Sequence, residues 1–359
     1  MGRFTLCPEH LHWQLAKFGC RHGSHDSGDL ERMVKLMKQV PGIRLGYGLL
    51  IQTWVSTSNC HYQFAALGVT AGYDSVVTVV VGIKVWDGLV IAADSATTFN
   101  FPNGSAQVYN NANKIFHLHR KYPVSAATWG LGALGSASVS TLAKELRRRF
   151  MGADPSHEDW TLEDNYTIRG IVDRLIEMMF DELYSPQVSS GLIPVSEMGF
   201  LIAGFQQSGP AHISEMWKIS ISDPTTRPVP QLVAGGLQAG YEVFAIEEAA
   251  KRLFLGVDPG LQAAILGAVE PAKQGDFLQM FMNYTRNPVL AGMPFADAIR
   301  LAEFIVEVTV GYAHFLPGPD VVGGPIEIAA ISRDEGFKWI SRKHYYQPNL
   351  NPKDPSHDV

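Results

Sequence analysis

The feature that most constrains the fold is a pair of apolar runs, residues 76–85 and 89–93, joined by Trp86-Asp87-Gly88. Both runs are rich in β-branched residues and are apolar except at Thr78 and Lys84, whereas a strand with one solvated face would alternate regularly between apolar and polar residues. A short Gly-containing connection between two such runs is typical of a β-hairpin. The pattern therefore predicts two neighbouring strands in a sheet that is covered on both faces.

Further strands and helices are predicted in separate blocks along the chain. A second hairpin at residues 115–118 and 124–128 precedes two helices, at 136–150 and 167–184. The later patterns predict strands at 198–206, 214–221 and 230–236, helices at 239–255 and 294–315, and a closing strand at 324–332. Segregated blocks of strands and helices, with sheets covered on both faces, predict an α+β fold of four stacked layers in the order αββα.

Residues 1–77 differ in composition from the rest of the chain. They hold all three cysteines, five of the twelve histidines and a net charge of +2, against −8 for the remainder. Their one periodic stretch predicts an amphipathic helix at 29–40. Cys20, His22 and His25 lack the second half of a zinc-binding pattern, so no metal site is predicted there.

These differences define the expected domain organisation. Residues 1–77 are expected to be a poorly ordered N-terminal extension, and residues 78–340 the folded domain. Within that domain, residues 257–293 have the character of an insertion. The Pro- and Asp-rich residues 341–359 are expected to be a flexible tail.

Composition excludes several classes of protein. With 46% hydrophobic and 18% charged residues the chain is an ordinary globular protein, and its net charge of −6 gives no electrostatic reason to bind nucleic acid. No apolar run reaches the roughly 20 residues that a membrane span needs. Three cysteines and no apolar signal core fit a reducing compartment. We therefore expect a cytoplasmic location, with neither nucleic acid nor membrane as a partner.

The residues that follow Val77, TVVVGIKVWDGLVIAADSATT, resemble the start of a mature proteasome-type β subunit. That family is the threonine-nucleophile branch of the N-terminal-nucleophile (Ntn) hydrolases. Thr78, Gly82, Gly88 and Asp94 fall in its register without a gap. Looser likeness continues in NKIFHLH, which offers Lys114, in GFLIAGF, and in DVVGGPIEIAAIS, which offers Asp320. The resemblance covers roughly residues 78–340 in element order and is specific over residues 78–98.

The resemblance implies the same four-layer αββα fold and a hydrolytic mechanism. Thr78 would be the nucleophile, with its own α-amine as the base. A free α-amine has a pKa of about 7.7–8.0, and a neighbouring Lys114 would lower that pKa. Asp94 would hold the Lys114 side chain in place, and the N–H of Gly130 would stabilise the oxyanion. Asp320 would be a further residue of the catalytic site. No cofactor or metal is implied.

The expected reaction is therefore hydrolysis of amide bonds, with a peptide or protein as the substrate. The family also implies assembly into a homo-oligomer, with a ring as one form. At two positions where the family often has serine, this chain has Gly235 and Gly323. An inactive, proteasome-like scaffold subunit therefore remains an alternative function. A small-molecule amidase of the same superfamily is a further alternative.

Simpler structural roles stand beside each functional one. Thr78 is compatible with a plain strand residue, Asp94 and Asp320 with turn formers, and Lys114 with a solvated edge lysine. His117 and His119 resemble a ligand pair on a strand, but no third ligand is evident nearby, so they are interpreted as strand-face residues. The charged run 147–149 at a helix end is expected to be solvated.

The proposed base requires a free amine on Thr78, so residues 1–77 must be absent from the active protein. Either they are a propeptide, or translation starts at residue 77. Val77 stands where the family usually has Gly before the catalytic Thr, and its branched side chain would crowd self-cleavage. We therefore favour a start at position 77, with the initiator methionine removed to expose Thr78.

Overall fold

The structure is a computed structural model that describes residues 52–53, 62–63, 78–100, 106–208, 211–317 and 320–343. The chain divides into two compact units. One comprises Met1–Tyr73 with Phe101–Ser105, and the other comprises Asp74–Asn100 with Ala106–Val359. Within the first unit, the described residues form a short antiparallel pair of β1 (Gln52–Thr53) and β2 (Tyr62–Gln63). The predicted helix at 29–40, with Cys20, His22 and His25, lies outside the described residues.

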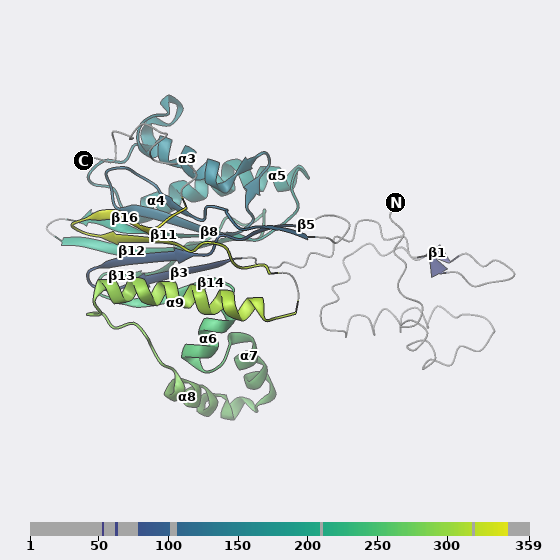
Figure 1. The fold of residues 1–359 in the computed structure, drawn as a ribbon. Helices are drawn as coiled ribbons and strands as arrows, with labels where there is room; N and C mark the ends of the chain where they lie inside the picture. The colour runs from purple at the N-terminus through teal and green to yellow at the C-terminus, as the bar shows by residue number, and fades with distance from the viewer. Residues whose placement is uncertain are drawn as a thin grey trace. The chain divides into compact units, whose positions relative to one another are not determined.

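The second unit is a mixed α+β fold built on two antiparallel five-stranded sheets (Figure 1). One sheet has the strand order β13-β12-β11-β8-β7, and the other has the order β14-β3-β4-β15-β16. The strands are β3 Val79–Lys84, β4 Gly88–Ala93, β7 Ile115–His117, β8 Val124–Gly130, β11 Met198–Ser208, β12 Ala211–Ile221, β13 Gln231–Gly235, β14 Gly240–Ala245, β15 Glu327–Ser332 and β16 Gly336–Ser341.

The predicted hairpin of β3 and β4 forms the middle of its sheet. Every residue of both strands is buried, which explains why their sequences do not alternate between apolar and polar. The two faces of β3 belong to different cores: Val79, Val81 and Ile83 pack toward helices, and Val80 packs toward the other sheet. Continuous apolarity is thus the signature of a strand buried on both faces.

The two sheets pack face to face through a core of apolar side chains. Leu89 and Ile91 of β4 contribute from one sheet, and Ala127 of β8 and Leu201 of β11 from the other. Gly82 lies where the two sheets approach each other closely. A Cβ atom built on it would come within 2.8 Å of a Leu201 methyl carbon and 3.1 Å of the Met216 sulfur.

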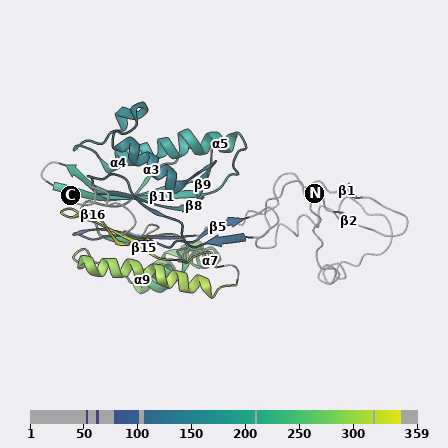
Figure 2. The ribbon, with the colours of Figure 1, turned by 45° about the horizontal axis from the view of Figure 1, so that its top comes forward.

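Helices cover the outer face of each sheet (Figures 1 and 2). Beside β8, β11 and β12 lie α3 (Val139–Phe150), α4 (Ile168–Ile176) and the π-helical η3 (Glu177–Tyr184), which form one apolar core with that sheet. Beside β3 and β4 lies α9 (Phe295–His314), and α6 (Glu248–Leu255) packs against α9.

Some predicted elements differ from those in the structure. The helix predicted at 239–255 is wrong over its first half, where β14 pairs antiparallel with β3 before α6 begins. Pairing with a distant strand decides this segment, and local propensity cannot reveal it. Also missed are β16, the pair β5 (Thr97–Asn100) and β6 (Ala106–Tyr109), and the short pair β9 (Ala133–Leu134) and β10 (Ala137–Ser138).

Helices occupy most of the predicted insertion at 257–293. These are α7 (Pro259–Ala268), the short η4 (Pro271–Lys273) and α8 (Gln274–Tyr284), and none of them has a buried residue. Apolar side chains there are exposed, including Leu261 at 51%, Met282 at 68% and Tyr284 at 70%.

The solvated character predicted for residues 147–149 is wrong for Arg149. Its guanidinium is buried, forms a bidentate ion pair with Glu182 of η3 and lies 4.7 Å from the ring centroid of Trp160. Trp160 belongs to the 3-10 helix η2 (Pro155–Trp160), which lies between the two helices predicted at 136–150 and 167–184. The guanidinium of Arg149 therefore links Glu182 of η3 and Trp160 of η2 in the helical layer.

Candidate active site

Strand register brings the first two candidate residues together. In the antiparallel pairing of β3 with β4, Val80 lies opposite Ala93. The residue before β3 and the residue after β4 therefore lie side by side at the open end of this hairpin. Those residues are Thr78, 3% exposed, and Asp94, fully buried. The Val79 N–H donates to Asp94 Oδ1 at 3.0 Å, which closes the strand ends on one another.

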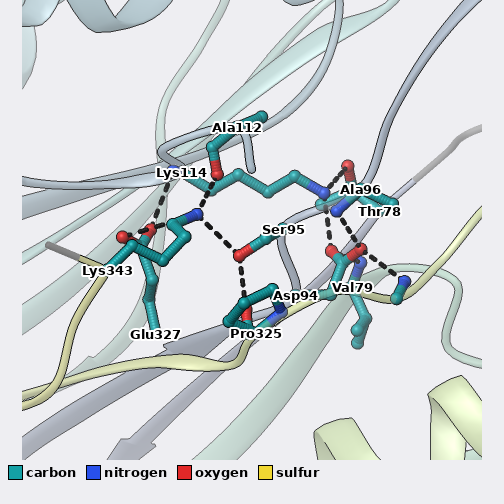
Figure 3. Close-up of polar contacts among 11 residues, drawn as sticks. Thr78, Val79, Asp94, Ser95, Ala96, Ala112, Lys114, Pro325, Glu327 and Lys343 are labelled. Carbon is teal, nitrogen blue, oxygen red and sulfur yellow. Dashed lines mark hydrogen bonds and ion pairs between the residues drawn. The ribbon is translucent and has the colours of Figure 1, made fainter. Parts of the chain in front are cut away.

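Lys114 reaches this end of the hairpin from the opposite sheet. It directly precedes β7, and its carbonyl accepts a hydrogen bond from the Thr128 N–H on β8. Facing sheets lie about 10 Å apart, so a long, extended side chain is needed to cross between them. The Lys114 ammonium lies 2.7 Å from Thr78 Oγ1 and 2.6 Å from Asp94 Oδ1 (Figure 3). A hydroxyl, an ammonium and a carboxylate thus form one buried chain.

The Asp94 carboxylate is held by four donors. Besides the Val79 N–H and the Lys114 ammonium on Oδ1, the N–H groups of Ala96 and Gly323 donate to Oδ2 at 3.0 and 3.1 Å. A carboxylate offers about four acceptor positions, so this one is fully satisfied as an anion. Its orientation, and with it the position of the Lys114 ammonium, is fixed.

Burial dominates the electrostatics of Lys114. Removal from water lowers the pKa of its ammonium below the ordinary value, while the Asp94 carboxylate opposes that shift. Two further charges act on the same group: Lys343 lowers the pKa and Glu327 raises it. Lys114 is thus a buried ammonium whose proton is held less firmly than that of a solvated lysine, and it directly contacts a threonine hydroxyl.

A second polar cluster adjoins this chain of contacts (Figure 3). The Lys343 ammonium donates to Ser95 Oγ at 2.6 Å and to the Ala112 carbonyl, and lies 3.5 Å from Glu327 Oε1. Ser95 Oγ donates in turn to the Pro325 carbonyl. The other oxygen of Glu327 accepts the backbone N–H of Lys114 at 3.2 Å.

Gly130 ends β8 at the same end of the sheet, two residues beyond Thr128. Its φ of 78° is in the left-handed region, and a Cβ atom there would lie 2.3 Å from the Glu197 carbonyl oxygen. Only glycine fits this position.

Asp320 does not join the site. It is exposed, and its carboxylate lies 3.0 Å from Nδ1 of the exposed His314.

Three residues of the cluster were not predicted from sequence. Glu327 had a signal, since it is the one charged residue in the apolar strand segment GPIEIAAIS and is 1% exposed. Ser95 was visible only as the neighbour of Asp94. Lys343 had no signal, because it follows β16 in a segment predicted to be a flexible tail. The structure differs there for residues 341–343, while residues 344–359 lie outside the described part.

Neither His117 nor His119 is arranged as a metal ligand. His117 stacks on Phe337 with ring centroids 4.1 Å apart, and His119 Nδ1 accepts the backbone N–H groups of Lys121 and Tyr122. Burial lowers the pKa of both imidazoles to about 4. Within the described residues, no group of three or more His, Cys, Asp or Glu side chains is placed to bind a metal ion.

A comparison with known protein-family models finds no match, and a comparison with curated protein sequences finds no significant relative. Among the helices in the described part of the chain, none is both long and apolar enough to cross a membrane.

Proposed function

We propose that the protein is a threonine-type Ntn hydrolase that cleaves amide bonds, with peptides as the substrate class. One observation carries the proposal: the buried Lys114 ammonium contacts both Thr78 Oγ1 and Asp94 Oδ1, at 2.7 and 2.6 Å. A strand residue chosen for β-propensity needs no such partner. A solvated edge lysine would not be 5% exposed, as Lys114 is.

The proposed reaction begins with attack of Thr78 Oγ1 on the substrate carbonyl carbon. The hydroxyl proton passes to the α-amine of Thr78, which then donates it to the departing amine as the C–N bond breaks. Lys114 stays protonated, so its positive charge favours the neutral, basic form of the α-amine and stabilises the developing alkoxide. Water then hydrolyses the ester on Thr78, with the α-amine again as the base.

The oxyanion needs a donor that does not reorganise during the reaction. We assign this role to the N–H of Gly130, which lies on β8 two residues beyond the neighbour of Lys114. The left-handed backbone of Gly130 fixes the orientation of the adjoining peptide groups. Asp320 has no role in this mechanism.

The architecture supports the same assignment. Two facing antiparallel sheets between helical layers correspond to the four-layer αββα sandwich expected for this superfamily. Thr78 directly precedes the inner strand β3, and removal of the residues before Thr78 would leave a free amine at the start of that strand. In the full chain that nitrogen is an amide, so we propose that the active form begins with Thr78.

We also propose that the chain assembles with copies of itself. The exposed apolar side chains of α7 and α8 are a surface that such contacts would cover. Sedimentation at micromolar concentration should show a mass well above 39.4 kDa. A monomer under these conditions would contradict self-assembly but not the proposed chemistry.

Labelling with a β-lactone tests the proposed function. A β-lactone acylates an activated hydroxyl, so intact mass should show one adduct, and peptide mapping should place it on Thr78. The labelled protein should lose hydrolysis of fluorogenic peptides in proportion. The absence of both adduct and hydrolysis from a protein that begins with Thr78 would favour the inactive scaffold. A small-molecule amidase would be labelled on Thr78 yet leave peptides intact.

A further inference from the structure

We infer that Lys343 is a positioning residue for the catalytic centre: it ties together the two loops that carry Asp94 and Lys114. The inference rests on the proposed function for its catalytic meaning, while the contacts that carry it are independent of that function. Lys343 lies two residues beyond the end of β16, far in sequence from both residues.

The first contact ties Lys343 to the loop of Asp94. Its ammonium donates to Ser95 Oγ at 2.6 Å, and Ser95 directly follows Asp94. Ser95 is itself fully buried, and its backbone N–H donates to the Gly323 carbonyl at 2.8 Å. Since the Gly323 N–H donates to Asp94 Oδ2, movement of Ser95 would displace both the carboxylate and one of its donors.

The second set of contacts ties Lys343 to the loop of Lys114. The ammonium donates to the carbonyl of Ala112, two residues before Lys114. Glu327 bridges the two lysines, with Oε1 3.5 Å from the Lys343 ammonium and Oε2 accepting the Lys114 backbone N–H at 3.2 Å. A single ammonium thus connects the loop after β4, the loop before β7 and strand β15.

The cost of burial argues against a passive role for this pair. The side chains of Lys343 and Glu327 are 8% and 2% exposed, and a buried ion pair usually gives no net stability over apolar residues of the same size. Fixed geometry is the property that such a buried network can provide. The network contacts the Thr78–Lys114–Asp94 chain, and the proposed reaction requires these three side chains to keep fixed relative positions.

The Lys343 charge also acts on Lys114. The charged groups that face the Lys114 ammonium are Asp94 after β4, Glu327 on β15 and Lys343 after β16. Lys343 is the like charge among them, so its removal should raise the pKa of Lys114. If Lys114 must stay protonated for catalysis, the alkaline limb of the activity profile should then move to higher pH.

The test compares Lys343→Met with Lys84→Met in the amide-hydrolysing form of the protein, with the N-terminus of each preparation determined by mass. Lys84 is a matched control, because it is 1% exposed and donates to the carbonyls of Gly236 and Gln238 at the other end of β3. We expect K343M to lower kcat between about tenfold and 100-fold, with KM nearly unchanged, since small misplacement of catalytic groups has effects of this size. Its alkaline limb should move to higher pH, whereas K84M should keep the wild-type kcat and profile.

A second readout does not depend on activity. In protein labelled with ¹³C at lysine Cε, the Lys114 resonance, assigned with Lys114→Arg, should titrate at higher pH in K343M and at the wild-type pH in K84M. Wild-type kcat and profile in K343M, with an unmoved Lys114 titration, would overturn the inference and leave the proposed function intact. A wild-type protein without amide hydrolysis would overturn the proposed function, and the Lys114 titration would still decide the coupling.

Ser95→Ala keeps the inference testable if K343M does not fold. It removes the contact of Lys343 with this loop, together with the hydrogen bond from Ser95 Oγ to the Pro325 carbonyl, and leaves every charge in place. Loss of a hydrogen bond of about 1 kcal/mol corresponds to a factor of about five, so kcat should fall about fivefold with no movement of the alkaline limb. Unchanged kcat in a folded S95A variant would contradict the positioning role.

Discussion

The Lys114 ammonium lies 2.7 Å from Thr78 Oγ1, although the two residues belong to facing sheets. The contact is buried and its other partner is the Asp94 carboxylate, itself held by three backbone N–H groups. An ammonium that donates a hydrogen bond to a hydroxyl oxygen would stabilise the negative charge on that oxygen when the hydroxyl loses its proton. The function proposed for this chain depends on that relationship.

Thr78→Ala is expected to remove amide hydrolysis, by about 10³-fold or more, while Thr78→Ser retains part of it. The alanine variant lacks the nucleophile, whereas serine keeps the hydroxyl and loses a methyl group. Thr309→Ala is a matched control, since Thr309 is also buried and its hydroxyl donates to the Ile305 carbonyl within α9. Initial rates and thermal melts should show similar small losses of stability for T78A and T309A, and loss of rate for T78A alone. Equal rates in T78A and wild type would exclude Thr78 as the nucleophile.

Lys114→Arg and Asp94→Asn should each lower kcat by about 10²–10³, the usual effect of removing one electrostatic group from a reaction centre. Arginine keeps the charge but presents a planar fork in a space that holds a compact ammonium. Asparagine keeps the shape of Asp94 but turns an NH₂ toward backbone N–H donors. Steady-state kinetics would count against these roles if either variant stayed within about tenfold of wild type.

Glycine at position 82 is required by the contact between the sheets. Gly82→Ala should lower the free energy of unfolding by about 1–3 kcal/mol, because the new methyl group would meet Leu201 and Met216 at less than contact distance. Gly311→Ala on α9, where a Cβ meets nothing within 4 Å, should instead raise it by up to about 1 kcal/mol. Urea unfolding of both variants measures the difference, and equal effects of the two substitutions would contradict tight sheet packing at Gly82.

The stability of the fold should rise with pH in the alkaline range because of Lys84. Burial lowers the pKa of its ammonium in the folded state below the ordinary 10.5. Between the lowered pKa and 10.5 the unfolded chain binds more protons than the folded chain, so the free energy of unfolding increases with pH. Lys84→Met removes this contribution. Urea unfolding at several pH values should therefore show wild type gaining stability relative to K84M as pH approaches 10.5, and a constant difference would contradict the burial of a charged Lys84.

Local pattern predicted the two strands that carry the first site residues. Continuous apolarity identified β3 and β4, while Thr78 and Asp94 were assigned to the site through the family resemblance. In the structure the antiparallel pairing brings these two residues together at one end of the hairpin. Lys114 was predicted through the resemblance, and the structure brings it to the same point. Contacts between distant segments were beyond local pattern. The pairing of β14 with β3 overrode a helix-like sequence, and Lys343 reaches the site only because β16 returns the chain to it.

The N-terminus of the active protein tests the central claim most directly. The mechanism uses the α-amine of Thr78 as the base, and that nitrogen is an amide as long as residue 77 precedes it. Intact mass and N-terminal sequencing of the native, amide-hydrolysing protein should therefore give a chain that begins with Thr78. An active protein whose Thr78 is still joined to Val77 would contradict the amine as the base, and with it the mechanism.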